Sequence, residues 1–265
     1  MMKLNVTWIE KIEKRTRFII STLILTLLLL VSTFFFFDKA WLFIPIFILA
    51  AYVCTYFSIY EGISHIEWVT LFLMPILVTI SFYFFYFLFP TRWITRIPFI
   101  IFYSISVYAM FLVSNIFNVG VEKSLQLYRA AFSVNYFYQS LMVFLFANLI
   151  LSLKLNFFLG GLLFFVLGSV MATHLFWSIK LEMHWEKHVV HLGLLVGFIL
   201  FQVGLLASFI PLQSSIMALL LSSVYYSVGG LVYLHLDERL FKETVREYLF
   251  VLIFVLGIVI LTINW

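Results

Sequence analysis

Three histidines follow one another closely in the second half of the sequence, at the spacing His184-x-x-x-His188-x-x-His191. At about 100° per residue on an α-helix, their imidazoles fall within a sector of about 60°. Neutral imidazoles grouped in this way suit Zn²⁺, or Fe²⁺ when carboxylates complete the ligand set. The alternative is a helix start at the membrane interface, whose histidines meet lipid headgroups, Lys187 and Glu186 or sense pH. No cofactor is expected unless Zn or Fe binds these three histidines.

Two amides lie inside an otherwise apolar run, where a polar side chain is expensive to bury. Asn135 and Gln139 are four residues apart, so they share a face of a helix. One interpretation is a polar lining for the path of a small solute. The other is hydrogen bonding between neighbouring helices, which commonly holds membrane bundles together. No carboxylate, lysine or arginine lies near the middle of an apolar run, which argues against an ordinary proton- or sodium-coupled transporter.

The elements that must position these residues are long apolar runs. Hydrophobic residues make up 65% of the sequence, and the 16 basic and 12 acidic residues all fall between the runs. About 20 apolar residues cross a bilayer, and continuous runs favour helices over the alternating strands of a barrel. The sequence therefore predicts an all-α, polytopic transmembrane bundle and one integral membrane domain over residues 1–265. The nine predicted spans are 18–37, 41–60, 68–89, 97–117, 132–153, 157–179, 189–210, 213–236 and 248–264.

The distribution of Lys and Arg predicts the orientation of these spans. With the N-terminus in the cytoplasm, the inner segments carry twelve Lys and Arg residues and the outer segments carry four. This excess fits the positive-inside rule and makes residues 1–17 a basic cytoplasmic segment. The first run lacks a small-residue cleavage site, so we expect a retained helix. The C-terminus, after nine crossings, is expected outside the cell membrane.

Two inner connections show helical spacing of apolar residues and are predicted to be amphipathic helices at the cytoplasmic interface, over residues 118–131 and 237–247. In the second, Glu238 and Lys242 are spaced for an i, i+4 ion pair, as are Arg239 and Glu243. Such helices present cations to lipid phosphates and charged side chains to partner proteins. The candidate contact residues are Glu122, Arg129, Arg239, Lys242, Arg246 and Glu247.

Small residues recur along one face of the spans at 157–179, 189–210 and 213–236, the last of which carries Ser215, Ala218, Ser222 and Gly229. Gly161 and Gly168 are seven residues apart on the first, and Gly193, Gly197 and Gly204 recur at steps of four and seven on the second. Small side chains let helix backbones approach closely, which is how helices associate in lipid. The pattern predicts that these three spans form a packed bundle.

Five stretches resemble an uncharacterised family of polytopic membrane proteins from candidate-phylum bacteria with reduced genomes. The resemblance covers most of the chain after the first span, implies a bacterial cytoplasmic membrane and supplies no activity. The histidine cluster is not part of the shared pattern. The stretches are Glu67-Trp68-x-Thr70-Leu71-Phe72-x-x-Pro75, Pro90-x-Arg92-Trp93-x-x-Arg96-x-Pro98, Asn115-Ile116-Phe117-Asn118-Val119, Gln126-Leu127-x-Arg129-Ala130-Ala131 and Arg239-Leu240-Phe241-Lys242-x-Thr244-Val245-Arg246-Glu247-Tyr248-Leu249.

The sequence contains no motif that identifies a reaction. Glycine-rich phosphate loops, a Gly-x-Ser-x-Gly nucleophile and a His-Glu-x-x-His zinc motif are all absent. We therefore expect a non-enzymatic membrane component that organises membrane lipids or other membrane proteins at the cytoplasmic face, with no nucleic-acid partner. The alternatives are a metal-dependent membrane enzyme, in which Glu186 or a carboxylate from another inner connection acts as general base beside the three histidines, and a small-solute transporter.

Overall fold

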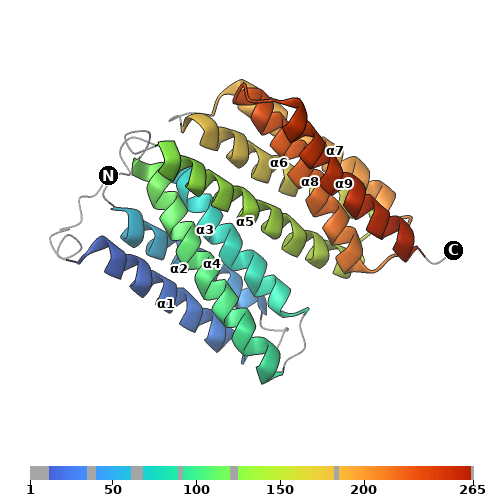
Figure 1. Ribbon diagram of the computed structural model, residues 1–265. Helices are drawn as coiled ribbons and strands as arrows, with labels where there is room; N and C mark the ends of the chain where they lie inside the picture. Colours follow the sequence, from blue (N-terminus) through green and yellow to red (C-terminus); the bar gives the residue numbers. More distant parts are fainter. Residues whose placement is uncertain are drawn as a thin grey trace. The chain divides into compact units, whose positions relative to one another are not determined.

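A computed structural model describes residues 12–34, 40–60, 68–88, 92–119, 125–181 and 185–263, and within these ranges the chain is all-α (Figure 1). Each helix follows one of the apolar runs of the sequence. The helices are α1 (Lys14–Ser32), α2 (Ala40–Ile59), α3 (Trp68–Tyr86), α4 (Trp93–Val119), α5 (Leu125–Ser152), α6 (Phe157–Lys180), α7 (Lys187–Ala207), α8 (Ser214–Leu236) and α9 (Lys242–Thr262).

All nine of these described helices are long and apolar enough to cross a membrane. The chain is therefore a multi-pass integral membrane protein with a helical fold, as its apolar runs predict. Several helices begin earlier than the predicted spans: α1 begins at Lys14, α5 at Leu125 and α9 at Lys242. An apolar run marks only the hydrocarbon layer, whereas the helix continues through the headgroup layer, where charged side chains reach water.

The two predicted amphipathic helices differ from the structure, which corrects their boundaries. Residues 125–131 form the first turns of α5, and residues 120–124 lie outside the described part of the chain. In the second segment, α8 ends at Leu236 and a turn follows, in which Glu238 has a left-handed φ of 55°. The amides of Glu238 and Arg239 donate to the carbonyls of His235 and Leu234, at 3.3 and 2.9 Å. This is a Schellman cap, which ends a helix.

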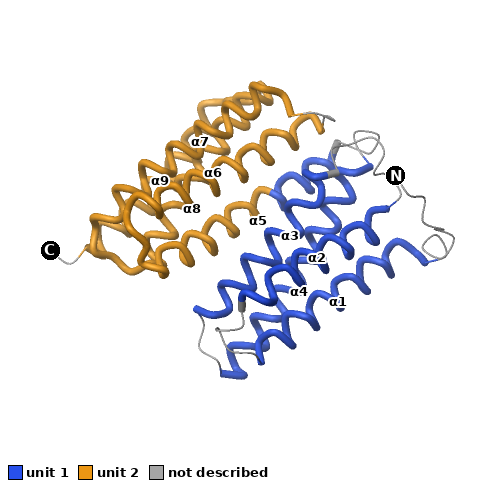
Figure 2. Tube along the Cα trace, turned by 180° about the vertical axis from the view of Figure 1, so that it is seen from behind, with its two compact units in different colours: residues 1–135 blue, residues 136–265 orange. Residues whose placement is uncertain are grey.

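The chain divides into two compact units, Met1–Asn135 and Tyr136–Trp265, and the boundary falls within α5 (Figure 2). The single domain expected over residues 1–265 stays a prediction. In unit 1, helices α1 to α4 pack against one another. In unit 2, α6 packs along α7, and α8 packs against α7 and α9.

Polar contacts between α3 and α4 in unit 1 compensate for a proline. Pro75 lies inside α3 and has no amide hydrogen, so the Leu71 carbonyl one turn earlier lacks its helical donor. The buried Ser114 hydroxyl of α4 donates to this carbonyl at 3.3 Å. Tyr103 of α4 also donates to Thr79 of α3, at 3.3 Å. The Ser114 side chain of α4 thus satisfies the Leu71 carbonyl, which Pro75 leaves without a donor within α3.

Replacing Ser114 with alanine should lower the free energy of unfolding by about 1 kcal/mol, because the Leu71 carbonyl loses its donor. In a Pro75→Ala background the same substitution should have a smaller effect, since residue 75 can then donate to Leu71 within α3. A double-mutant cycle in mixed micelles, followed by circular dichroism, measures the difference. Equal effects of Ser114→Ala in both backgrounds would show that Ser114 does not serve the carbonyl.

Close packing of α6 and α7 follows the predicted stripes of small residues in unit 2. A Cβ atom on Gly197 would collide with the Ser169 hydroxyl and lie 2.6 Å from the Phe165 carbonyl oxygen, which is backbone. A Cβ atom on Gly168 would lie 3.0 Å from the Cα atom of Gly197. The prediction of a packed bundle is confirmed, since α6, α7 and α8 pack against one another.

Candidate functional site

A groove runs along the first half of α9. It has a volume of about 370 Å³, and its lining consists of two cations followed by apolar side chains. The remainder of α9 is also largely exposed, since Val255 and Val259 are its only buried residues. The lining residues are Lys242, Val245, Arg246, Leu249, Phe250 and Ile253.

Helical geometry separates the cations of this groove from the carboxylates nearby. At about 100° per residue, the six lining residues fall within a sector of about 140°. Glu243 and Glu247 lie beyond the edge of this sector and do not line the groove. Within the described part of the chain, neither Lys242 nor Arg246 forms an ion pair. One end of the groove is therefore positively charged, and the other end is apolar.

The remaining candidate contact residues do not join this groove. Arg239 lies in the turn before α9, and its Nε atom is 3.4 Å from Asp237 Oδ2. Residues 237–241 form a turn and not a helix. The predicted ion pairs of Glu238 with Lys242 and of Arg239 with Glu243 required both partners to lie on one helix, so that argument does not apply. Arg129 belongs to the first turns of α5 in unit 1, and Glu122 lies outside the described residues.

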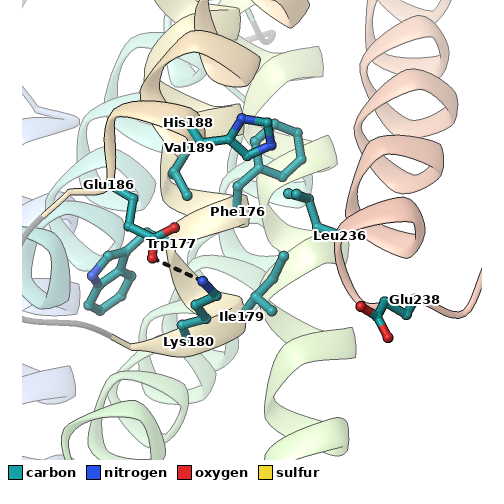
Figure 3. A pocket seen from close by; sticks show the side chains of 9 residues that line it. All are labelled: Phe176, Trp177, Ile179, Lys180, Glu186, His188, Val189, Leu236 and Glu238. Carbon is teal, nitrogen blue, oxygen red and sulfur yellow. Dashed lines mark hydrogen bonds and ion pairs between the residues drawn. The ribbon is translucent and has the colours of Figure 1, made fainter.

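A second feature is a cavity of about 240 Å³ at one end of unit 2, where α6 and α8 end and α7 begins (Figure 3). Left-handed residues terminate both helices at this end: Leu181 after α6, with a φ of 53°, and Glu238 after α8. Lys180 Nζ lies 2.9 Å from Glu186 Oε1 across the connection from α6 to α7. The lining residues are Phe176, Trp177, Ile179, Lys180, Glu186, His188, Val189, Leu236 and Glu238.

The predicted histidine cluster is only partly described. His188 lines this cavity, whereas His191 is exposed and its Nδ1 atom donates to the Lys187 carbonyl at 2.6 Å. His184 lies outside the described residues. Among the residues that are described, no group of three or more histidine, cysteine or acidic side chains could hold a metal ion. Glu186 forms an ion pair with Lys180, as described above.

Gln139 is the centre of a buried hydrogen-bond network between α5, α6 and α8. Tyr225 of α8 donates to Gln139 Oε1 at 2.6 Å, and Gln139 Nε2 lies 2.8 Å from His174 Nδ1 of α6. An amide nitrogen can only donate, so His174 Nδ1 accepts and the proton of the neutral imidazole is on Nε2. All three side chains are at most 3% exposed. This geometry corresponds to the interhelical alternative, because it uses both ends of the amide.

Asn135 lies one helical turn before Gln139 and is also fully buried. Neither its Nδ2 nor its Oδ1 atom has a hydrogen-bond partner among the described residues. Two amides that look equivalent in the sequence therefore have different environments. The solute path that they were predicted to line stays a prediction.

Sequence reasoning missed His174 and Tyr225 as the partners of Gln139. His174 is a single histidine within an apolar run, and Tyr225 is one of 14 tyrosines, so neither is marked as a partner in the sequence. The sequence does indicate that such partners exist, because the Gln139 amide lies in an apolar run and a buried amide requires hydrogen-bond partners. It could not identify them, since they lie 35 and 86 residues away.

Comparison of the chain with family models, curated proteins and solved structures finds no match.

Proposed function

We propose that this integral membrane protein is a non-enzymatic component of the bacterial cytoplasmic membrane that binds anionic phospholipid at the cytoplasmic face. The observation that carries the proposal is the groove on α9, in which Lys242 and Arg246 are followed by Leu249, Phe250 and Ile253. The order of these residues along α9 matches the order of chemical groups in a phospholipid, from a charged phosphate to an apolar acyl chain.

The dimensions of α9 support this match. At about 1.5 Å per residue, Ile253 lies about 16 Å along the helix axis from Lys242. The cations therefore lie in the headgroup layer when the apolar residues are in the hydrocarbon layer. A basic residue near an anionic membrane surface contributes about 1 kcal/mol, so two cations favour an anionic over a zwitterionic lipid by about 2 kcal/mol. This corresponds to a preference of roughly thirtyfold.

The distribution of Lys and Arg is the reason for placing the start of α9 at the cytoplasmic face. The positive-inside distribution of Lys and Arg favours a cytoplasmic N-terminus and an external C-terminus. With this orientation the start of α9 lies at the inner leaflet, which is the anionic leaflet. Bacterial origin is proposed from the resemblance of residues 67–75 and 239–249, among other stretches, to the family named above.

Lipid retention in native mass spectrometry tests the proposal. Wild-type protein, loaded with equal amounts of phosphatidylglycerol and phosphatidylcholine, should retain the anionic lipid preferentially. The variant Lys242→Gln/Arg246→Gln should lose this preference by tenfold or more, on the order of the loss expected for two cations. The control variant Lys154→Gln/Lys187→Gln loses the same charge away from the groove and should behave like wild type. Equal retention by both variants would contradict the proposal.

A further inference from the structure

The cavity at the ends of α6, α7 and α8 has walls that suit an apolar or aromatic ligand body. Phe176 and Trp177 contribute rings to the wall and are 1% and 3% exposed, so the surrounding helices hold them in place. Ile179, Val189 and Leu236 complete the apolar part of the lining. At about 240 Å³ the cavity is smaller than a drug-sized site of about 300–1,000 Å³.

Among the lysine and glutamate residues of the rim, the negative charges outnumber the positive ones; His188 is the remaining titratable residue of the lining. Lys180 and Glu186 lie on one side of the cavity and neutralise each other as an ion pair (Figure 3). Glu238 lies on the opposite side, and it has no ion pair within the described part of the chain. The Schellman cap of α8 fixes its backbone, as described above. The Glu238 carboxylate therefore lies at the rim without a basic partner among the described residues.

The helix termini add to this negative potential. The C-terminal ends of α6, at Lys180, and of α8, at Leu236, both lie at the cavity. Each C-terminus carries roughly half a negative elementary charge from the aligned peptide dipoles of its helix. The N-terminus of α7 lies at the same cavity and offsets one of these two charges. The other helix end and the Glu238 carboxylate therefore favour a cation in this cavity.

We propose that the cavity binds a small organic cation, namely an ammonium group attached to an apolar or aromatic body. The ammonium group lies toward Glu238, and the body packs on Phe176, Val189 and Leu236. Aromatic faces attract ammonium ions through their ring quadrupole, which adds to the attraction of the carboxylate. This site is separate from the α9 groove and does not depend on lipid binding.

Calorimetric titration of the detergent-purified full-length protein with benzyltrimethylammonium tests the site. Benzenesulfonate has a similar aromatic body with the opposite charge, and titration of protein-free micelles measures partition into detergent. Both titrations use the Lys242→Gln/Arg246→Gln variant, whose α9 groove lacks the cations that could hold the sulfonate. In this variant the ammonium probe should bind saturably at one site per chain, and the sulfonate should not bind. No saturable binding of the cation, or equal binding of both probes, would overturn the proposal.

Two variants should change the affinity for the cation in opposite directions. Glu238→Gln should weaken binding of the cation roughly fivefold to tenfold, which is the loss of one charged contact, whereas the control Glu243→Gln should bind like wild type. Lys180→Gln removes a positive charge from the rim, so it should strengthen binding. Unchanged affinity in Glu238→Gln, or weaker binding in Lys180→Gln, would overturn the proposal. Loss of anionic-lipid preference on α9 leaves these results unaffected.

Discussion

Replacing Gly197 with alanine should lower the free energy of unfolding by about 2 kcal/mol, the typical size of an overpacking effect. The new methyl group would meet the Ser169 hydroxyl, which can rotate, and the Phe165 carbonyl oxygen at 2.6 Å, which cannot. Relief therefore requires α6 and α7 to move apart along their shared face. Unfolding in mixed micelles, followed by circular dichroism, measures the change.

Gly160 provides a matched control on α6, because a Cβ atom there would have no atom within 4 Å. Gly160→Ala gains the same helix propensity, up to about 1 kcal/mol, without the clash. It should leave stability unchanged or slightly raised. If both alanine variants had the same stability, close approach of α6 and α7 would not be the reason for glycine at residue 197.

Replacing Gln139 with leucine should lower the free energy of unfolding by about 1–3 kcal/mol, because it leaves two buried polar groups unpaired. The Tyr225 hydroxyl loses its acceptor, and His174 Nδ1 loses its donor. Neither side chain can turn to water, since both are at most 3% exposed. The same unfolding measurement should also show that Gln139→Leu is less harmful in a Tyr225→Phe background.

Asn135→Leu is the matched control for Gln139→Leu, since both residues are 0% exposed on the same helix. Asn135 has no hydrogen-bond partner among the described residues, so leucine should change stability by less than about 0.5 kcal/mol. If Gln139→Leu were as mild as Asn135→Leu, the network with His174 and Tyr225 would not hold the helices together.

The spans could be predicted from the sequence because the bilayer imposes a length and an apolar character that a single helix must satisfy alone. Packing of α6 on α7 was also predictable, since the stripe of Gly193, Gly197 and Gly204 reports a close approach directly. Helix ends were less predictable. The apolar spacing of residues 237–247 continues through Glu238, and only the backbone shows that this residue adopts a left-handed conformation.

The candidate sites depend on contacts between residues that are distant in sequence. Charge and spacing identified Lys242 and Arg246, because both precede an apolar run on one helix. They also selected Arg239, whose charge is directed to Asp237 by a turn that the pattern does not reveal. The unbalanced carboxylate of Glu238 became visible only once α6, α7 and α8 were placed together.

Photo-crosslinking with an anionic phospholipid tests lipid binding by α9 most directly. Proteoliposomes would contain phosphatidylglycerol with a diazirine in its acyl chain, and mass spectrometry would locate the adducts. Phe250 in the groove and Leu49 on α2 are both 68% exposed, so nonspecific contact with lipid labels them equally. The account predicts labelling concentrated at Leu249, Phe250 and Ile253, competed by unlabelled phosphatidylglycerol and lost in Lys242→Gln/Arg246→Gln. Equal labelling of Phe250 and Leu49, unchanged in that variant, would contradict it.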